Sequence, residues 1–100
     1  CPLDDIVPDS GVCALAGDRQ VAVFRVGADQ VFAIANHDPF SKANVLSRGI
    51  TGDIKGELVV ASPVYKQQFR LATGRCVEDE SVSVESFAVR IRNGIVEVEA

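Results

Sequence analysis

The apolar residues of the chain fall into short runs separated by turn residues, which is the pattern of β-strands. Apolar residues dominate 12–16, β-branched and aromatic residues are frequent in 20–26, and Gly17-Asp18 is the expected turn between them. Residues 31–35 are apolar throughout, which predicts a strand buried on both faces. We expect these three segments to form an antiparallel meander.

The clearest hairpin lies in the C-terminal segment FAVRIRNGIVEVE, residues 87–99. Asn93-Gly94 is a preferred pair for a type I′ turn, because both residues tolerate positive φ. A two-residue turn places 92 opposite 95, 91 opposite 96, 90 opposite 97 and 89 opposite 98. In this register the valines and isoleucine share one face, which we expect to pack on the meander, while Arg90 faces Glu97 on the other.

Residues 36–76 lie between these β blocks and are predicted to form two loops around a short strand. Each loop contains a proline step, Asp38-Pro39 in the first and Ser62-Pro63 in the second. Because proline fixes its own φ and restricts the residue before it, each step indicates a defined bend.

Three short elements are predicted inside this insert. Residues 57–61 form a strand, 67–71 begin a hairpin closed by Thr73-Gly74, and 40–46 are long enough for one helical turn. With the meander and the terminal hairpin, they predict one all-β domain over residues 1–100. Its expected architecture is an antiparallel sandwich or barrel with a smaller two-loop subdomain at 36–76.

Length and composition fit a globular domain and exclude several classes of protein. Hydrophobic residues make up 47% of the 100 positions, which suffices for a core. No apolar run approaches the ~20 residues of a membrane helix, and the net charge of −4 argues against nucleic acid as the main partner. No phosphate-binding glycine motif occurs, so we expect no FAD or NAD site in this chain.

Cysteine and histidine usage gives no sign of an independent active site. Cys1, Cys13 and Cys76 are an odd number and form no C-x-x-C pair, so we expect no disulfide framework and a reducing, cytoplasmic environment. His37 is the only histidine and has no oriented nucleophile beside it, so no catalytic residue is predicted. The sequence begins at Cys1-Pro2 without any methionine, and we expect N-terminal residues of the natural protein to be missing.

Charge is distributed unevenly along the chain. The segment 37–76 carries a net charge of +3, whereas the remaining residues carry −7. A basic middle within an acidic frame indicates a docking face, with ordinary surface charge as the alternative. The acidic run Glu78-Asp79-Glu80 is predicted to be a solvated loop.

The order of meander, two-loop insert and final hairpin resembles a Rieske-type iron–sulfur domain over nearly the whole chain. The loops of that family read C-P-H and C-P-x-H-G-x-x-F, and their two cysteines and two histidines hold a [2Fe–2S] cluster. The prolines and Phe69 match, but the four ligand positions hold Asp38, Phe40, Ser62 and Tyr65. A phenyl ring has no lone pair to donate, and hard oxygens replace thiolates poorly on iron. We therefore expect no cluster, no metal and no electron transfer in this chain.

A bound cluster also ties its two loops together, so its loss requires another connection. We hypothesise that Phe40 and Tyr65, one ring from each loop, meet and fill the vacated space. The alternative is that one or both rings point outward and anchor a partner. In both cases the ends of the loops are the candidate partner interface, with six expected members: His37, Phe40, Lys42, Arg48, Tyr65 and Lys66.

Three segments, DQVFAIANHDPFSKANVLSRG, GELVVASPVYKQQFRL and GRCVEDE, resemble more specifically the small subunits of bacterial assimilatory NAD(P)H-dependent nitrite reductases. This resemblance implies a cytoplasmic oxidoreductase complex that reduces nitrite to ammonium in nitrate assimilation. It also implies a large-subunit partner that carries FAD, siroheme and a [4Fe–4S] cluster. The alternatives are a generic Rieske-fold interaction module and an electron carrier with an altered metal site at Asp38, Ser62, Tyr65 and His37.

Overall fold

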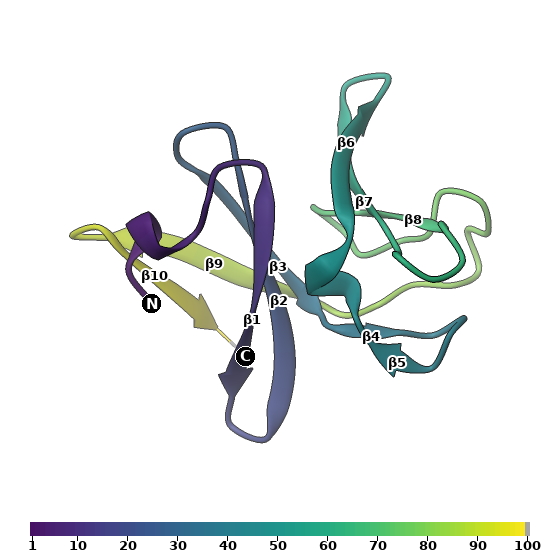
Figure 1. The fold of residues 1–100 in the computed structure, drawn as a ribbon, viewed down its shortest axis with the longest axis horizontal. Coiled ribbons are helices and arrows are strands. Elements are labelled where there is room, and N and C mark those ends of the chain that lie inside the picture. The colour runs from purple at the N-terminus through teal and green to yellow at the C-terminus, as the bar shows by residue number, and fades with distance from the viewer. Residues whose placement is uncertain (100) are drawn as a thin grey trace.

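Five antiparallel strands form the main sheet in the order β1-β2-β3-β9-β10 (Figure 1). The predicted meander comprises β1 (Ser10–Ala16), β2 (Arg19–Val26) and β3 (Gln30–Ala35). The terminal hairpin comprises β9 (Ser86–Arg92) and β10 (Ile95–Glu99). The structure is a computed structural model that describes residues 1–99, and it confirms the all-β, Rieske-like fold.

Strands β2 and β3 separate two apolar clusters, because successive side chains of a strand point to opposite faces. Phe24 and Ile34 belong to the cluster that faces the insert. Val23 and Ala33 belong to the cluster that faces the terminal hairpin. Strand β3 is therefore buried on both faces, as its continuous apolar run predicts.

The terminal hairpin has the predicted register, with Arg90 opposite Glu97. The Arg90 Nε donates to Glu97 Oε1 at 2.7 Å, and the turn at Asn93-Gly94 has positive φ at both residues. On the other face Val96 is only 5% exposed and packs in the second cluster. Ile91 differs from its valine neighbours, because it remains 37% exposed.

The insert forms two small antiparallel sheets. One pairs β4 (His37–Asp38) with β5 (Ala43–Asn44), and the other has the order β6-β7-β8. Strand β7 (Glu57–Ala61) has the predicted bounds, and β8 (Gln68–Arg70) lies within the predicted start of a hairpin.

One prediction within the insert is wrong, and one strand was not predicted. The segment 40–46 contains strand β5 rather than a helical turn, and a short 3-10 turn, η2 (Leu46–Arg48), begins at its last residue. The sequence also gave no indication of β6 (Ile50–Ile54). This strand pairs with β7 through a two-residue turn in which Lys55 and Gly56 both have positive φ, the geometry that suits a hairpin.

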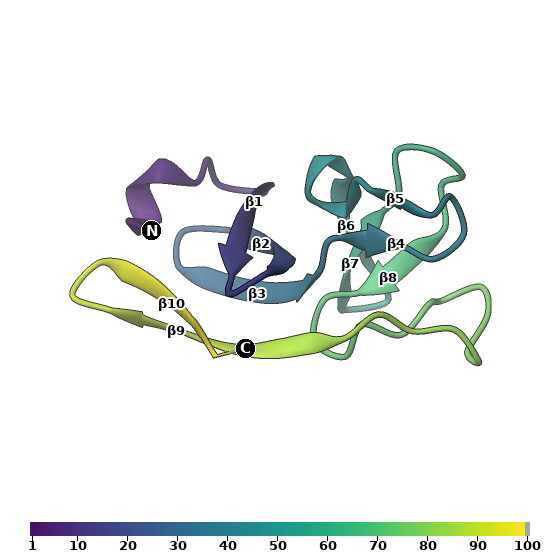
Figure 2. The same cartoon turned by 90° about the horizontal axis from the view of Figure 1, so that it is seen from below.

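The two views place the loops of the insert and the N-terminal segment at opposite ends of the molecule (Figures 1 and 2). Cys1 lies beside β10, where its backbone carbonyl accepts the Val96 N–H at 2.7 Å. A short 3-10 turn, η1 (Leu3–Asp5), follows. Among residues 1–99 no helix has the length and hydropathy needed to cross a membrane.

Candidate functional site

The two loops of the insert are joined by a buried hydrogen bond between Asp38 and Ser62. Both residues are 0% exposed. The Ser62 hydroxyl donates to Asp38 Oδ2 at 2.5 Å, across 24 positions of sequence. These are two of the positions at which the resemblance predicts altered cluster ligands, and the structure shows that they bond to each other.

The Asp38 carboxylate accepts two further hydrogen bonds from its own loop. The Phe40 N–H donates to Oδ1 at 2.9 Å, and the Ser41 hydroxyl donates to Oδ2 at 2.9 Å. Burial raises the pKa of Asp38, but the hydrogen bonds from Ser62, Phe40 and Ser41 outweigh this effect, so the pKa lies below its ordinary value. The group is therefore a buried carboxylate at neutral pH, held by uncharged donors, since no ion pair within residues 1–99 includes it.

The two loops repeat the same backbone pattern over five residues. The Lys42 N–H donates to the Asp38 carbonyl at 2.7 Å, and the Lys66 N–H donates to the Ser62 carbonyl at 3.1 Å. Both lysines have positive φ, 60° and 67°. In each loop the side-chain oxygen of the first residue also accepts the N–H of the third, at 2.9 Å and 3.3 Å. Local hydrogen bonds of this kind define a turn without any bound group.

The predicted pairing of Phe40 with Tyr65 is wrong. The ring of Phe40 is half-buried and packs on Phe69, with 6.1 Å between the ring centroids. Phe69 is fully buried on β8, so it offers Phe40 a partner in the core. Tyr65 instead points outward and is 61% exposed, which is the alternative that the sequence left open.

The other predicted interface residues are all exposed, and three of the four lie in or next to the two loops. Lys42 and Lys66 occupy the two loops, and His37 lies on β4 with its Nδ1 3.2 Å from the Asn44 Oδ1. Arg48 lies in η2, which contacts β1 and β2 of the main sheet. It is therefore set apart from the ends of the loops.

Sequence reasoning missed two residues. Asn36 is 1% exposed and connects the first loop to its surroundings. Its side-chain N–H groups donate to Gln20 Oε1 and to the Asn44 carbonyl. Its side-chain oxygen accepts the Ser47 N–H. Its place directly after a buried strand was the available signal. Val64, in the second loop, is 46% exposed beside Tyr65; an apolar residue in an otherwise polar loop was the signal there.

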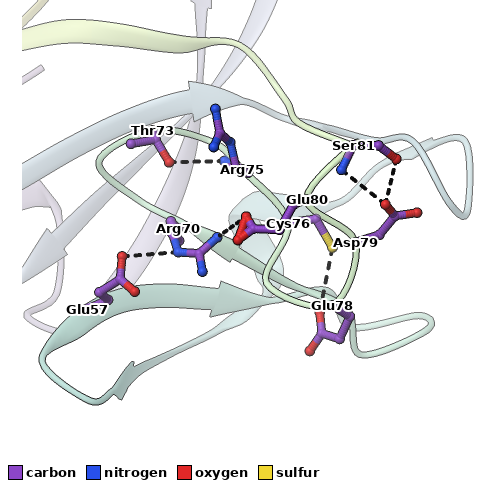
Figure 3. A network of polar contacts seen from close by, with 9 residues as sticks. All are labelled: Glu57, Arg70, Thr73, Arg75, Cys76, Glu78, Asp79, Glu80 and Ser81. Carbon is purple, nitrogen blue, oxygen red and sulfur yellow. Dashed lines mark hydrogen bonds and ion pairs between the residues drawn. The ribbon is translucent and has the colours of Figure 1, made fainter.

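A polar network borders the insert where β8 meets the acidic run (Figure 3). Arg70 bonds to Glu57 at 3.0 Å and to Glu80 at 3.2 Å. The acidic run is exposed, as predicted, but it is also tied to its neighbours. Cys76 donates to Glu78 Oε1 at 3.6 Å, and burial raises the pKa of its thiol, which makes the thiol a poor nucleophile.

The residues at the ligand positions do not fit a [2Fe–2S] cluster. Asp38 and Ser62 are hydrogen-bonded to each other. Phe40 has no atom that can bind a metal, and its ring packs on Phe69. The Tyr65 hydroxyl belongs to a ring that faces outward. Within residues 1–99 no group of three His, Cys, Asp or Glu side chains could hold a metal ion. Iron–sulfur clusters of this type require thiolate and imidazole donors.

Comparison with known proteins gives consistent matches over nearly the whole chain. The profile of the Rieske-like [2Fe-2S] domain matches residues 1–99. The nitrite reductase (NADH) small subunit of Escherichia coli (strain K12) is 54% identical over 99 residues, which cover 98% of this chain and 92% of that protein. The NMR structure of the E. coli protein NirD has a TM-score of 0.91 at 55% identity, covering 98% of this chain and 90% of that one.

A third match involves a much larger protein. The nitrite reductase [NAD(P)H] large subunit of Klebsiella oxytoca is 48% identical over 96 residues, which make up 96% of this chain but only 10% of that protein. The large subunit thus contains a segment that is similar to nearly all of this chain.

Proposed function

The chain belongs to the Rieske-like domain family and, within it, to the nitrite reductase small subunits, and we propose that it serves as a non-catalytic subunit that binds the large subunit of an NAD(P)H-dependent nitrite reductase. The observation that carries this proposal is the similar segment in the K. oxytoca large subunit. When one chain contains both parts, the small domain remains beside the larger part at a high effective concentration. A separate small subunit has to reach the same position by binding.

The chemistry of the loops supports a role without redox function in this chain. The Asp38–Ser62 bond and the packing of Phe40 on Phe69 close the two loops with protein contacts. We propose that FAD, siroheme and the [4Fe–4S] cluster reside in the large subunit and that the complex is cytoplasmic. The small subunit then supports the assembly or activity of the large one by its shape and surface.

Metal analysis of the small subunit tests its lack of a cluster. The chain is purified without oxygen, and iron and acid-labile sulfide are measured alongside its visible absorption. We expect neither element in stoichiometric amount and a colourless protein. Stoichiometric iron and sulfide in folded protein would contradict this part of the proposal.

Nitrite reduction by the large subunit, with and without this chain, tests the function itself. The large subunit is titrated with the small one, and nitrite-dependent oxidation of NADH is followed together with complex formation by size-exclusion chromatography. We expect a stable complex and an activity or stability of the large subunit that depends on the added chain. If the two proteins do not associate, the proposed function is wrong.

A further inference from the structure

The two loops and the adjoining strand β4 carry five exposed side chains, which we call the loop tip and define as His37, Lys42, Val64, Tyr65 and Lys66. We propose that the loop tip docks on the large subunit, at an acidic surface with an apolar pocket for Tyr65. This inference rests on the proposed function and specifies which surface of the small subunit performs it.

Tyr65 is the natural anchor of such a contact. It is the one exposed aromatic residue among the six of the chain, and residues 1–99 include all six. Its neighbour Val64 is 46% exposed, so two consecutive residues of this loop expose apolar surface. Tyrosine adds large contact area at low cost in side-chain entropy and is frequent among residues that dominate interfaces.

The lysines of the loop tip have a backbone conformation that does not favour lysine. Lys42 and Lys66 have φ values of 60° and 67°, a region that glycine adopts without strain. In the Rieske motif C-P-x-H-G-x-x-F, the position of Lys66 is a glycine. The backbone at these two positions therefore does not require lysine, and glycine would fit there at least as well.

The charge of the loop tip is available to a partner. None of the four ion pairs within residues 1–99 includes a lysine. The neighbouring acidic run is already engaged, because Glu78 accepts the Gln68 N–H and Glu80 bonds to Arg70. Two ammonium groups without an ion pair, on the same pair of joined loops as an exposed aromatic ring, are complementary to an acidic surface with an apolar depression.

The position of the loop tip also suits docking. It lies at the end of the molecule opposite Cys1 (Figures 1 and 2). In the K. oxytoca protein the similar segment belongs to a longer chain, and such a segment is connected through its ends. A contact at the loop tip would leave a connection through the N-terminal end unobstructed.

Affinity measurements on the complete small and large subunits test the proposal. Isothermal titration calorimetry at low and high salt compares the wild type with the double variant Lys42→Glu/Lys66→Glu and with Tyr65→Ala. We expect the charge reversal to weaken binding at least about tenfold and to reduce its salt dependence. We expect Tyr65→Ala to weaken binding about 30-fold, the size of an interface hot spot.

Lys55→Glu is the matched control. Lys55 also has positive φ, 51°, but it lies in the turn before β7, whereas the second loop follows the other end of that strand. The control should bind within about twofold of the wild type. If it weakens binding as much as the loop-tip variants do, the effect is one of net charge and the proposal is wrong.

A double substitution to glycine separates docking from folding. Lys42→Gly/Lys66→Gly relieves the backbone strain, so its melting temperature should not fall, while its affinity for the large subunit should decrease. A purely structural role of these lysines would leave affinity unchanged. If the wild type binds and all loop-tip variants bind equally well, the loop tip is not the interface, but the proposed function stands. If the wild type itself does not bind, the proposed function is wrong.

Discussion

Replacing Ser62 with alanine tests whether the buried hydrogen bond between the loops holds them together. The substitution removes the hydroxyl that donates to Asp38 at 2.5 Å and leaves almost the same side-chain volume. Because both residues are 0% exposed, water cannot take the place of the hydroxyl without a rearrangement of the loops. The carboxylate keeps its two donors from the first loop, but the connection to the second loop is lost.

The expected magnitude follows from the charge of the acceptor. A hydrogen bond to a charged group contributes about 1.5–3 kcal/mol to the free energy of unfolding. A buried acceptor that loses its donor also adds a desolvation penalty to the folded state. We expect the free energy of unfolding to fall by about 2 kcal/mol. For a domain of this size, that loss lowers the melting temperature by roughly 8–16 °C.

Urea unfolding at neutral pH, followed by circular dichroism, measures this loss. Ser81→Ala is the control, because the Ser81 hydroxyl also donates to a carboxylate, Asp79 Oδ1 at 2.6 Å, but on the surface. Substitutions of that kind change stability by less than about 0.5 kcal/mol. If Ser62→Ala is no more destabilising than Ser81→Ala, the buried bond does not hold the loops, and the reasoning about their closure is refuted.

Three further predictions concern stability. The folded pKa of Asp38 lies below its unfolded value of about 4. Its carboxylate therefore stabilises the fold above that pH and loses this effect as the pH falls through the folded pKa. In urea unfolding, Asp38→Asn should lower the free energy of unfolding at neutral pH, and this loss should shrink below about pH 4. Arg70→Ala removes the bonds to Glu57 and Glu80 together with the packing of the arginine stem, so it should lower the melting temperature. The effect should be smaller at high salt, because exposed ion pairs are screened, and an unchanged melting temperature would contradict this. Gly74→Ala adds a Cβ at φ +78°, 2.0 Å from the backbone carbonyl oxygen of Val84. The substitution should lower the free energy of unfolding by at least about 2 kcal/mol in thermal unfolding. A neutral result would mean that the chain around Gly74 is loosely packed.

The strands could be predicted where hydrophobic period and turn residues agreed. In the terminal hairpin, the Asn93-Gly94 turn and the opposition of Arg90 to Glu97 require the same register, and the structure has it. Strand β6 was missed because its alternation is weak, with Gly52 and Asp53 in the middle. Its partner β7 and the turn between them supply the order that its own residues do not.

The site could be predicted in position but not in the direction of its side chains. The proline steps and the motif resemblance identified both loops and all four altered ligand positions. They did not show that Phe40 would pack on Phe69 while Tyr65 faces solvent. They also placed Arg48 with the loops, although η2 holds it beside the main sheet.

By itself, the sequence determined the class of fold, the central strands and the loss of soft ligands, because strand patterns and donor chemistry are properties of the residues themselves. The tertiary structure decided how the two loops are joined. Loops have no repeating period, so the direction of each side chain depends on residues distant in sequence. The bond between Asp38 and Ser62 exists only because β7 brings the second loop to the end of β4.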